Sequence, residues 1–335
     1  MIREAIDKLV KRIDLSEADM RGSFGEIMSG SCADAQIAAF LTALRMKGET
    51  VAEITAAAGV MRDKSVRIDA GKNLVDTCGT GGSGINTFNI STAASLVAAG
   101  CGLKVAKHGN RAASSRCGSA DVLEALGVKI DVAPDMVQRC IMEIGIGFMY
   151  APLFHSAMKY ASNARREIGM RTIFNILGPL SNPAGALSQV IGVCDASLTG
   201  KMARVLKGLG SKRAFVVCGY DRLDEITITG KTKVAELKDG RIREYYISPS
   251  QFGIGRASLD DIEGGDAKEN AGMIMSVLKG ETGARRDIVL LNAAAAIVAG
   301  NKASDIKSGI KVAAQSIDSG TALNKLVSLV EMTNR

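Results

Sequence analysis

A glycine-rich stretch follows a short run of β-forming residues and reads Asp76-Thr77-Cys78-Gly79-Thr80-Gly81-Gly82-Ser83-Gly84. Its glycines satisfy the GxGxxG pattern of dinucleotide-binding sites. That pattern also needs an acidic residue about 20 positions further on to hold the ribose hydroxyls, and residues 99–109 contain none. The stretch therefore does not indicate a nicotinamide site. It still suits an anion, because glycines let consecutive backbone amides approach one without obstruction; a tight turn without a ligand is the alternative.

Two further segments carry groups that bind phosphate. Asn89-Ile90-Ser91-Thr92 opens an alanine-rich helix, where hydroxyls and free amides lie at a positive helix N-terminus. A simple helix cap is the alternative there. After an apolar strand comes Lys107-His108-Gly109-Asn110-Arg111-Ala112-Ala113-Ser114-Ser115, followed by Gly118-Ser119-Ala120-Asp121. Cations, a flexible glycine and hydroxyls at this density predict an anion-binding loop.

Adjacent carboxylates, Asp224 and Glu225, follow the apolar run 214–217. Oxygen ligands next to a phosphate site suit Mg²⁺, which usually keeps some of its waters. A solvated acidic loop is the alternative. The segment 163–183 contains Arg165, Arg166 and Arg171, whose guanidinium groups suit a carboxylate, although salt bridges on a helix surface would also explain them.

Helical spacing dominates the first 65 residues and predicts an all-helical unit. Ile2, Ala5, Ile6, Leu9, Val10 and Ile13 form one expected apolar face. Capping patterns predict helix starts at Ser16 with Asp19, at Ser31 with Asp34, and at Thr50 with Glu53. Gly48 is a predicted helix end.

After Gly71 short β-rich runs alternate with glycine-rich turns and alanine-rich helices. Strands are expected at 73–78, 103–106, 189–194 and 213–218, and a surface hairpin at 231–242. This alternation predicts an α/β fold with a mostly parallel sheet. Because ligands bind at the carboxyl ends of parallel strands, we expect the chemistry in the turns that follow Val75 and Val105.

Composition excludes several classes of protein. The 335 residues carry a net charge of +7, divided as −1, +4 and +4 over residues 1–70, 71–190 and 191–335, and aromatic residues make up only 4%. This diffuse charge does not predict a nucleic-acid partner. The seven cysteines include no CxxC pair, which favours reduced thiols in the cytoplasm. The charged N-terminus indicates no signal peptide, and the apolar run 288–299 is too short for a membrane span.

In their order along the chain, these segments resemble the anthranilate phosphoribosyltransferases of tryptophan biosynthesis, and the resemblance covers nearly the whole chain. The segments that carry it are Gly79-Thr80-Gly81-Gly82 with Thr87-Phe88-Asn89-Ile90-Ser91-Thr92, Lys107 to Arg111 through Ser119-Ala120-Asp121, Met149 to His155, Arg171 to Leu180, and Leu223-Asp224-Glu225. One such segment alone would not distinguish this family from others, whereas all of these segments in the family's order do.

The resemblance implies a fold like that of the pyrimidine nucleoside phosphorylases. It implies a small helical domain of residues 1–68 with about 160–187, a large α/β domain of 69–159 and 188–335, and a homodimer through the helical domain. The implied reaction is Mg²⁺-dependent transfer of a phosphoribosyl group from 5-phosphoribosyl 1-diphosphate to the amino group of anthranilate, in the cytoplasm, without nucleic-acid or membrane partners. The alternatives are a pyrimidine nucleoside phosphorylase and a non-catalytic nucleic-acid-binding relative.

The resemblance also implies site residues. Those expected to line the phosphoribosyl diphosphate site are Gly79, Gly82, Ser83, Thr87, Asn89, Ile90, Ser91, Thr92, Lys107, His108, Gly109, Asn110, Arg111, Ala112, Ala113, Ser114, Ser115 and Ser119. Anthranilate would meet Gly79, Asn110 and Arg165, and Mg²⁺ would be held by Ser91, Asp224 and Glu225. His108 is a candidate positioning group, whereas His155, among apolar neighbours, is expected to be structural. The sequence departs from the common family pattern at Ser83, where many members have Asp, and at Ser156, where Pro is common.

Overall fold

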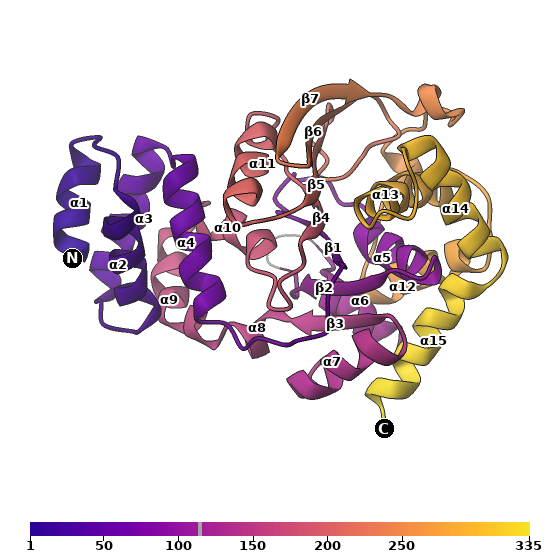
Figure 1. Cartoon of the computed structure of the whole chain (residues 1–335), viewed down its shortest axis with the longest axis horizontal. Coiled ribbons are helices and arrows are strands. Elements are labelled where there is room, and N and C mark those ends of the chain that lie inside the picture. Colours follow the sequence, from indigo (N-terminus) through magenta and orange to yellow (C-terminus); the bar gives the residue numbers. More distant parts are fainter. Residues whose placement is uncertain (113–115) are drawn as a thin grey trace.

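The computed structural model describes residues 1–112 and 116–335, and it shows a helical bundle beside a larger α/β part (Figure 1). The bundle contains α1 (Ile2–Val10), α2 (Glu17–Met28), α3 (Asp34–Lys47) and α4 (Val51–Asp63). Helix α9 (Lys159–Ile168), much later in the sequence, packs against α2 and α3. The expected all-helical N-terminal unit is therefore confirmed.

Two of the three predicted helix caps are confirmed. Ser16 and Thr50 each accept a hydrogen bond from a backbone N–H three residues later. The prediction for Ser31 is wrong, because Asp34 is already the first residue of α3 and the side chain of Gln36 accepts the hydrogen bond from the residue before the helix.

The predicted apolar face of the first helix is only partly correct. Ile2, Ala5 and Leu9 are buried in the bundle, but Val10 and Ile13 are 69% and 50% exposed. Helix α1 ends at Val10, and Arg12 adopts a left-handed backbone with φ +60°. The helical spacing therefore stops before Ile13, and these two side chains face outward.

Within the part of the chain that the structure describes, seven strands form one sheet in the order β3-β2-β1-β4-β5-β6-β7. The strands are β1 (Leu74–Gly79), β2 (Lys104–Gly109), β3 (Ile146–Tyr150), β4 (Ser188–Gly192), β5 (Arg213–Gly219), β6 (Thr232–Lys238) and β7 (Arg241–Ile247). Strands β1 to β5 are parallel, whereas β6 and β7 are antiparallel. The mostly parallel sheet is confirmed, and the predicted hairpin extends its edge.

Helices cover both faces of the sheet. One face carries α5 (Ile90–Gly100), α12 (Ala267–Leu278), α13 (Ala284–Ala299), α14 (Ile306–Asp318) and α15 (Thr321–Thr333), with α6 (Ser119–Ala125) packed against α12. The other face carries α7 (Pro134–Glu143), α8 (Ala151–Phe154), α10 (Phe174–Leu177) and α11 (Leu198–Gly208). Strand β5 shows how the faces divide, because Phe215 and Val217 join the core around α13 while Ala214 and Val216 join the core shared with the bundle.

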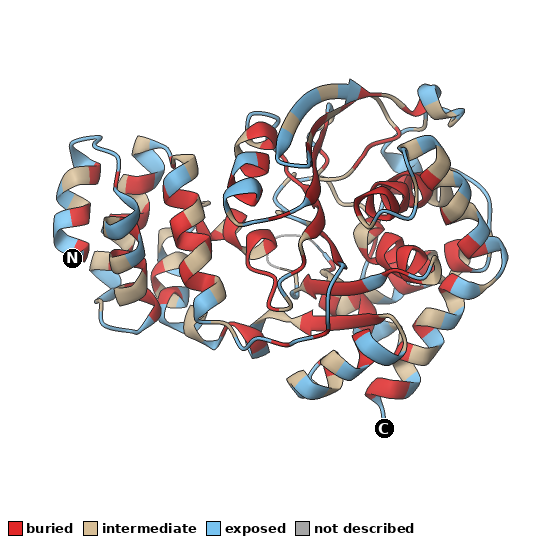
Figure 2. Cartoon of the chain, viewed as in Figure 1, coloured by how far each residue is buried: buried red, intermediate tan, exposed pale blue. Residues whose placement is uncertain are grey.

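Helix α13 contains the longest apolar run of the sequence, and its residues from Ile288 to Ala299 are all buried (Figure 2). Its apolar character is explained by packing against α5 and α14. In the residues that the structure describes, no helix is both long and apolar enough to span a bilayer.

Strand β1 lies between β2 and β4, and the chain continues from it outward in both directions across the sheet. A reversal of strand order in a parallel sheet opens a crevice at the carboxyl ends of the strands beside it. Strands β1, β2, β4 and β5 all end in glycine, at Gly79, Gly109, Gly192 and Gly219. The fold thus places the loops that follow these strands at one edge.

Candidate active site

The glycine-rich loop leaves the end of β1 with its backbone largely exposed. Gly81, Gly82 and Gly84 have positive φ angles of 63°, 78° and 76°, a conformation that other residues rarely adopt. The N–H of Gly81 donates to Oδ2 of Asp224 at 2.8 Å. The hydroxyl of Ser83 stays within the loop, where it accepts from the N–H of Ile85 at 3.2 Å. The loop is thereby connected to the predicted metal ligands.

The start of helix α5 meets the same carboxylates. The N–H of Ser91 donates to Oε1 of Glu225 at 3.1 Å, so this amide, expected to be free, already has an anionic partner. Ile90 and Thr92 are buried. The side chain of Asn89 is used inside the fold, where Nδ2 donates to the carbonyl of Cys117 and Oδ1 accepts from Asn270. Of these residues, Ser91 is the one whose contacts lead to the carboxylate pair.

Lys107 and His108 lie within strand β2, not in a loop after it. The expected strand 103–106 is too short, because β2 pairs with β3 as far as Gly109. Lys107 is only 2% exposed, and its Nζ donates to the carbonyl of Thr77 at 2.6 Å and lies 3.5 Å from Oγ of Ser91. Burial lowers the pKa of this lysine, while nearby acids including Glu225 act in the opposite direction. Lys107 is thus a buried lysine that contacts Ser91 and interacts electrostatically with Glu225.

Strand β2 is also tied to β1 by a buried acid. Asp76 is fully buried and accepts from the N–H of His108 at 3.2 Å and from Nδ2 of Asn182 at 2.8 Å. The same amide of Asn182 donates to the carbonyl of Ala106 at 2.8 Å. Asp76 opens the glycine-rich stretch of the sequence, but no sequence pattern indicated Asn182 as its partner.

The two histidines of the chain are neighbours, with ring centroids 5.0 Å apart. Both are buried, and Nε2 of each has no hydrogen-bond partner among the described residues. Burial lowers the pKa of His108 to about 3 and that of His155 to about 4. Both rings are therefore neutral at physiological pH.

The segment after β2 forms ion pairs and hydrogen bonds with residues of helix α6. Arg111 forms ion pairs with Asp121 at 3.0 Å and Glu124 at 2.8 Å, so its charge is already matched. The N–H of Ala112 donates to Asp121, and the hydroxyl of Ser119 donates to the carbonyl of Asn110 at 3.3 Å. The expected site residues Ala113, Ser114 and Ser115 lie outside the described residues.

Asp224 and Glu225 follow β5 and lie beside Gly79, Gly81 and Ser91. Burial raises the pKa of Asp224, with the charge of Arg171 acting against it. Burial and the neighbouring charge of Asp224 raise the pKa of Glu225 to about 8. The described residues contain no group of three or more His, Cys, Asp or Glu side chains placed to hold a metal, so this pair offers few protein ligands.

The remaining expected site residues are more widely spread. Arg165 lies on α9 with its guanidinium carbon 5.0 Å from the ring centroid of Phe174, while Gly79 and Asn110 lie at the ends of β1 and β2. The expected anthranilate set is therefore divided between the bundle and the sheet. Thr87 forms an isolated β-bridge with Glu263, which places it beside the segment that leads into α12.

Sequence reasoning missed the contribution of Gly192 at the end of β4. A Cβ atom at this position would overlap the backbone of Asp224, so the absence of a side chain lets the loop that carries the carboxylates lie against the strand. The available signal was that the predicted strand 189–194 contained a glycine near its end.

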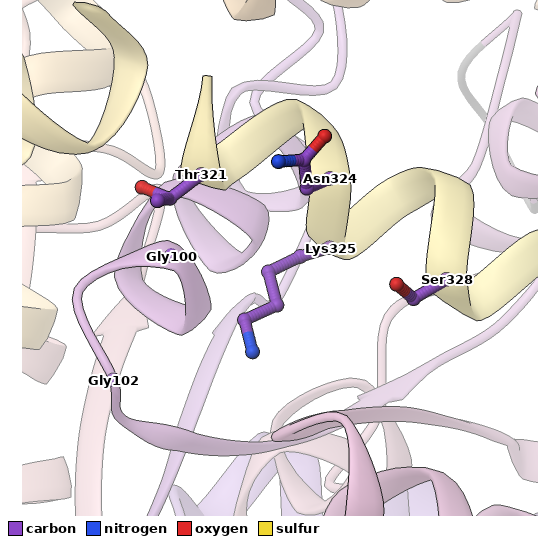
Figure 3. A pocket seen from close by; sticks show the side chains of 6 residues that line it. All are labelled: Gly100, Gly102, Thr321, Asn324, Lys325 and Ser328. Atoms are coloured by element: carbon purple, nitrogen blue, oxygen red, sulfur yellow. The ribbon is translucent and has the colours of Figure 1, made fainter. Parts of the chain in front are cut away.

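A separate surface pocket of about 270 Å³ is lined by Gly100, Gly102, Thr321, Asn324, Lys325 and Ser328 (Figure 3). It lies at the C-terminal end of α5, whereas the carboxylate pair lies at its N-terminal end. Nζ of Lys325 already donates to the carbonyl of Ile144 at 2.6 Å. None of the expected site residues lines this pocket.

Comparison with known proteins shows similarity along the whole chain. A family model described as "Glycosyl transferase family, helical bundle domain" matches residues 3–65, and one described as "Glycosyl transferase family, a/b domain" matches residues 71–323. The anthranilate phosphoribosyltransferase of Citrifermentans bemidjiense is 55% identical, over 100% of this chain and 99% of that protein. That of Methanocorpusculum labreanum is 58% identical, over 98% of this chain and 97% of that protein.

Solved structures agree with the sequence relatives. The crystal structure of anthranilate phosphoribosyltransferase from Thermus thermophilus superimposes with a TM-score of 0.94 at 40% identity, covering 99% of both chains. The Saccharomyces cerevisiae enzyme, solved in complex with PRPP and Mg, gives a TM-score of 0.91 at 30% identity, covering 99% of this chain and 98% of that chain.

Proposed function

The chain belongs to the anthranilate phosphoribosyltransferases, glycosyltransferases of tryptophan biosynthesis, and from that premise we propose its reaction in detail. It transfers the phosphoribosyl group of 5-phosphoribosyl 1-diphosphate to the amino group of anthranilate and releases diphosphate. The observation that carries this proposal is the meeting of an exposed glycine loop, a helix start, a buried lysine and a carboxylate pair at one edge of the sheet.

The donor set suits Mg²⁺. Asp224 and Glu225 provide oxygen atoms, and the hydroxyl of Ser91 belongs to the residue whose N–H already contacts Glu225. Burial and the neighbouring charge of Asp224 raise the pKa of Glu225, so an arrangement of two ionised carboxylates is disfavoured unless a cation lies beside them. A divalent cation would stabilise that arrangement, and a site with few protein ligands leaves room for substrate phosphates. The yeast relative was solved with PRPP and Mg.

The proposed chemistry needs stabilisation of a leaving group more than a covalent nucleophile. Departure of diphosphate from the anomeric carbon leaves positive charge on the ribose and places negative charge on the diphosphate. Mg²⁺, when bound, would neutralise part of that negative charge. Exposed backbone N–H groups of the Gly79–Gly84 loop would donate hydrogen bonds to the phosphate oxygens, and the charge of Lys107 would act on Glu225.

The acceptor amine needs positioning more than activation. The amino group of anthranilate is aromatic and neutral at pH 7, so attack requires alignment with the anomeric carbon. We assign the carboxylate of anthranilate to Arg165, which forms no ion pair among the described residues and whose guanidinium lies 5.0 Å from the ring of Phe174. Gly79 and Asn110, at the ends of β1 and β2, are the other proposed contacts. The neutral ring of His108 is proposed as a positioning group.

The residues expected to bind phosphoribosyl diphosphate differ in whether their side chains already have partners within the protein. Gly79, Gly82, Ser83, Ser91, Gly109 and Asn110 lie on the loops and helix start at the strand ends. Arg111 is matched by Asp121 and Glu124, so it would need to exchange those partners to meet a phosphate. The side chain of Asn89 is used in hydrogen bonds, Ile90 and Thr92 are buried, and the N–H groups of Ile90 and Thr92 donate to the carbonyls of Phe88 and Asn89. We propose that these three residues shape the helix start.

A fluorescence assay tests the reaction. Anthranilate fluorescence is expected to fall when the protein is mixed with 5-phosphoribosyl 1-diphosphate and Mg²⁺, and to persist when either is omitted. Unchanged fluorescence with active substrate stocks would refute the proposal. Release of free base from uridine or thymidine in the presence of phosphate would instead indicate a nucleoside phosphorylase.

A double substitution tests the metal ligands. Asp224→Asn with Glu225→Gln removes both charges while preserving side-chain shape. Turnover is expected to fall at least about a hundredfold, because stabilisation of the leaving group is lost, and the remaining turnover should no longer depend on Mg²⁺. Asp239→Asn, in the exposed turn between β6 and β7, serves as the control. Kinetics of the double variant matching those of the wild type would exclude the metal role.

We also propose a homodimer formed through the helical bundle and a cytoplasmic location. The bundle carries exposed apolar side chains at Val10, Ile13 and Met46, which suit a second copy of the chain. The cytoplasmic assignment follows from the sequence expectation of reduced cysteines.

A further inference from the structure

Arg171 lies where the bundle meets the glycine loop, and the function proposed above gives it no role. It follows α9 and precedes α10. One of its guanidinium nitrogens donates to the carbonyl of Gly81 at 2.9 Å and to Sγ of Cys194 at 3.4 Å. Among the described residues, no carboxylate lies within 4.0 Å of this guanidinium. A backbone carbonyl and a thiol, not an acid, thus hold this cation.

The contact with Arg171 completes a pair of restraints on Gly81. The N–H of Gly81 donates to Asp224 at 2.8 Å, and its carbonyl accepts from Arg171 at 2.9 Å. These two groups belong to the peptide units on either side of the Gly81 Cα, so fixing both fixes the φ and ψ of a residue that has no side chain to restrict them. The hydroxyl of Thr80, within the loop itself, also donates to this carbonyl, at 3.4 Å. Arg171 therefore supplies the shorter of the two hydrogen bonds, and the one that comes from outside the loop.

The next residue shows that the loop and the arginine are shaped to each other. A Cβ atom at Gly82 would overlap the guanidinium of Arg171. The arginine therefore occupies the space that a side chain on the loop would take. Gly82 also has a positive φ of 78°, so a substitution there would strain the backbone and displace Arg171 together.

We propose that Arg171 is a positioning residue for the diphosphate-binding loop: it holds Gly81 from the bundle side, so that the exposed backbone of Gly79–Gly84 is ordered before substrate arrives. This inference rests on the proposed function for the identity of the ligand, and on the contacts of Gly81 for the positioning. An ordered loop binds the diphosphate substrate with a smaller loss of conformational entropy. Arg171 therefore affects binding of that substrate more than the rate of the chemical step.

Hydrogen exchange of the ligand-free protein tests the positioning itself. In Arg171→Ala, amides of residues 79–84 are expected to exchange at least about tenfold faster, because a charge-assisted hydrogen bond is lost. Arg166→Ala is the matched control, since this exposed arginine near the end of α9 donates only to Asn163 among the described residues. Exchange in Arg171→Ala that equals the wild type, in a protein with an unchanged melting temperature, would overturn the proposal.

Steady-state kinetics test the consequence for substrate binding. Arg171→Ala is expected to raise KM for 5-phosphoribosyl 1-diphosphate about tenfold to a hundredfold, with KM for anthranilate and kcat changed by less than about threefold. Arg171→Lys keeps one donor for the Gly81 carbonyl and is expected to recover part of the loss. Gly82→Ala should also raise KM for 5-phosphoribosyl 1-diphosphate selectively. In the double variant with Arg171→Ala, the rise in this KM should be smaller than the product of the rises in the two single variants.

The two measurements separate the possible failures. A raised KM with unchanged hydrogen exchange would show that Arg171 contacts the substrate directly, which overturns the positioning role. Equal rises in KM for both substrates would also overturn it. A wild-type protein with no transferase activity would refute the proposed function, while the exchange experiment would still decide whether Arg171 orders the loop.

Discussion

Buried charge is the feature that most sets the chemistry of individual residues. Asp76 and Lys107 are both almost completely buried, and Lys107 contacts Thr77 and Ser91. Burying charges without partners is costly, so these groups balance one another. Burial raises the pKa of Asp224 and of Glu225, which disfavours their ionised forms. A divalent cation bound by these two carboxyls would stabilise the ionised forms.

Arg165 tests how the aromatic acid is recognised. Arg165→Ala is expected to raise KM for anthranilate about tenfold to a hundredfold, and KM for the diphosphate substrate far less, because a guanidinium that binds a carboxylate contributes selectively to that substrate. Arg166→Ala should leave both constants near the wild type. Parallel rises for both substrates in Arg165→Ala would place Arg165 outside the anthranilate site.

His155 makes a prediction about stability and pH. Burial lowers its pKa from 6.5 to about 4, so between these values the unfolded chain binds a proton that the folded protein does not. This group therefore destabilises the fold as the pH falls from about 6.5 to 4, by up to about 1.4 kcal/mol per pH unit.

The substitution His155→Gln removes that titration, so the urea midpoint of the variant should depend less on pH over this range than that of the wild type. His108 titrates in the same direction, and some dependence should remain. Parallel curves for variant and wild type would contradict the assignment.

Among the secondary-structure elements, the residue at the end of each strand determines how closely a neighbouring loop can pack against that strand. Gly192→Ala would place a methyl group in the backbone of Asp224, which must then shift away from β4. We expect Mg²⁺-dependent turnover to fall at least about tenfold and stability to fall by about 1–3 kcal/mol, although no metal ligand is altered. Gly230→Ala, where a Cβ meets nothing within 4 Å, should preserve turnover. Full activity in Gly192→Ala would mean that this packing is dispensable.

The sequence predicted the positions of β1, β2, β4 and β5, but neither every strand nor every strand end. Lys107 and His108 are polar, so periodicity ended the strand at residue 106, whereas pairing with Phe148 and Met149 extends it. Strand β3 itself was not predicted. Local sequence patterns reflect the strand propensity of single residues. Which polar residues belong to a strand depends on the hydrogen bonds to the neighbouring strand, and these are known only from the assembled sheet.

The same distinction applies to the candidate site. The residue types at Asp224 and Glu225 suit a metal, and the family resemblance adds Ser91 as a further expected ligand. In the structure the N–H of Ser91 donates to Glu225. The match of Arg111 to Asp121 and Glu124, and the hold of Arg171 on Gly81, join residues that are distant in the sequence. No spacing rule for helices or strands predicts such pairs.

At the scale of the molecule, the bundle and the α/β part are joined by side chains that donate to backbone carbonyls. Arg62 on α4 donates to the carbonyl of Leu209 at 3.4 Å, and Lys201 on α11 donates to that of Glu49 at 2.8 Å. Arg165 and Arg171 lie on the segment that includes α9 and leads to α10, which passes from one part to the other. The proposed sites for the two substrates therefore depend on both parts.

The outer face of the bundle predicts the assembly. Lys47 donates to Asp14 at 2.7 Å, and the residues that precede these two, Met46 and Ile13, are 72% and 50% exposed. Ile13→Asp with Met46→Glu is expected to convert a dimer into a 35.0 kDa monomer in sedimentation equilibrium, because charged groups in an apolar interface lack partners. Met142→Glu, 54% exposed on α7, should leave the dimer intact. A wild-type protein that sediments as a monomer would contradict the proposed interface, and it would leave these apolar side chains as ordinary surface residues.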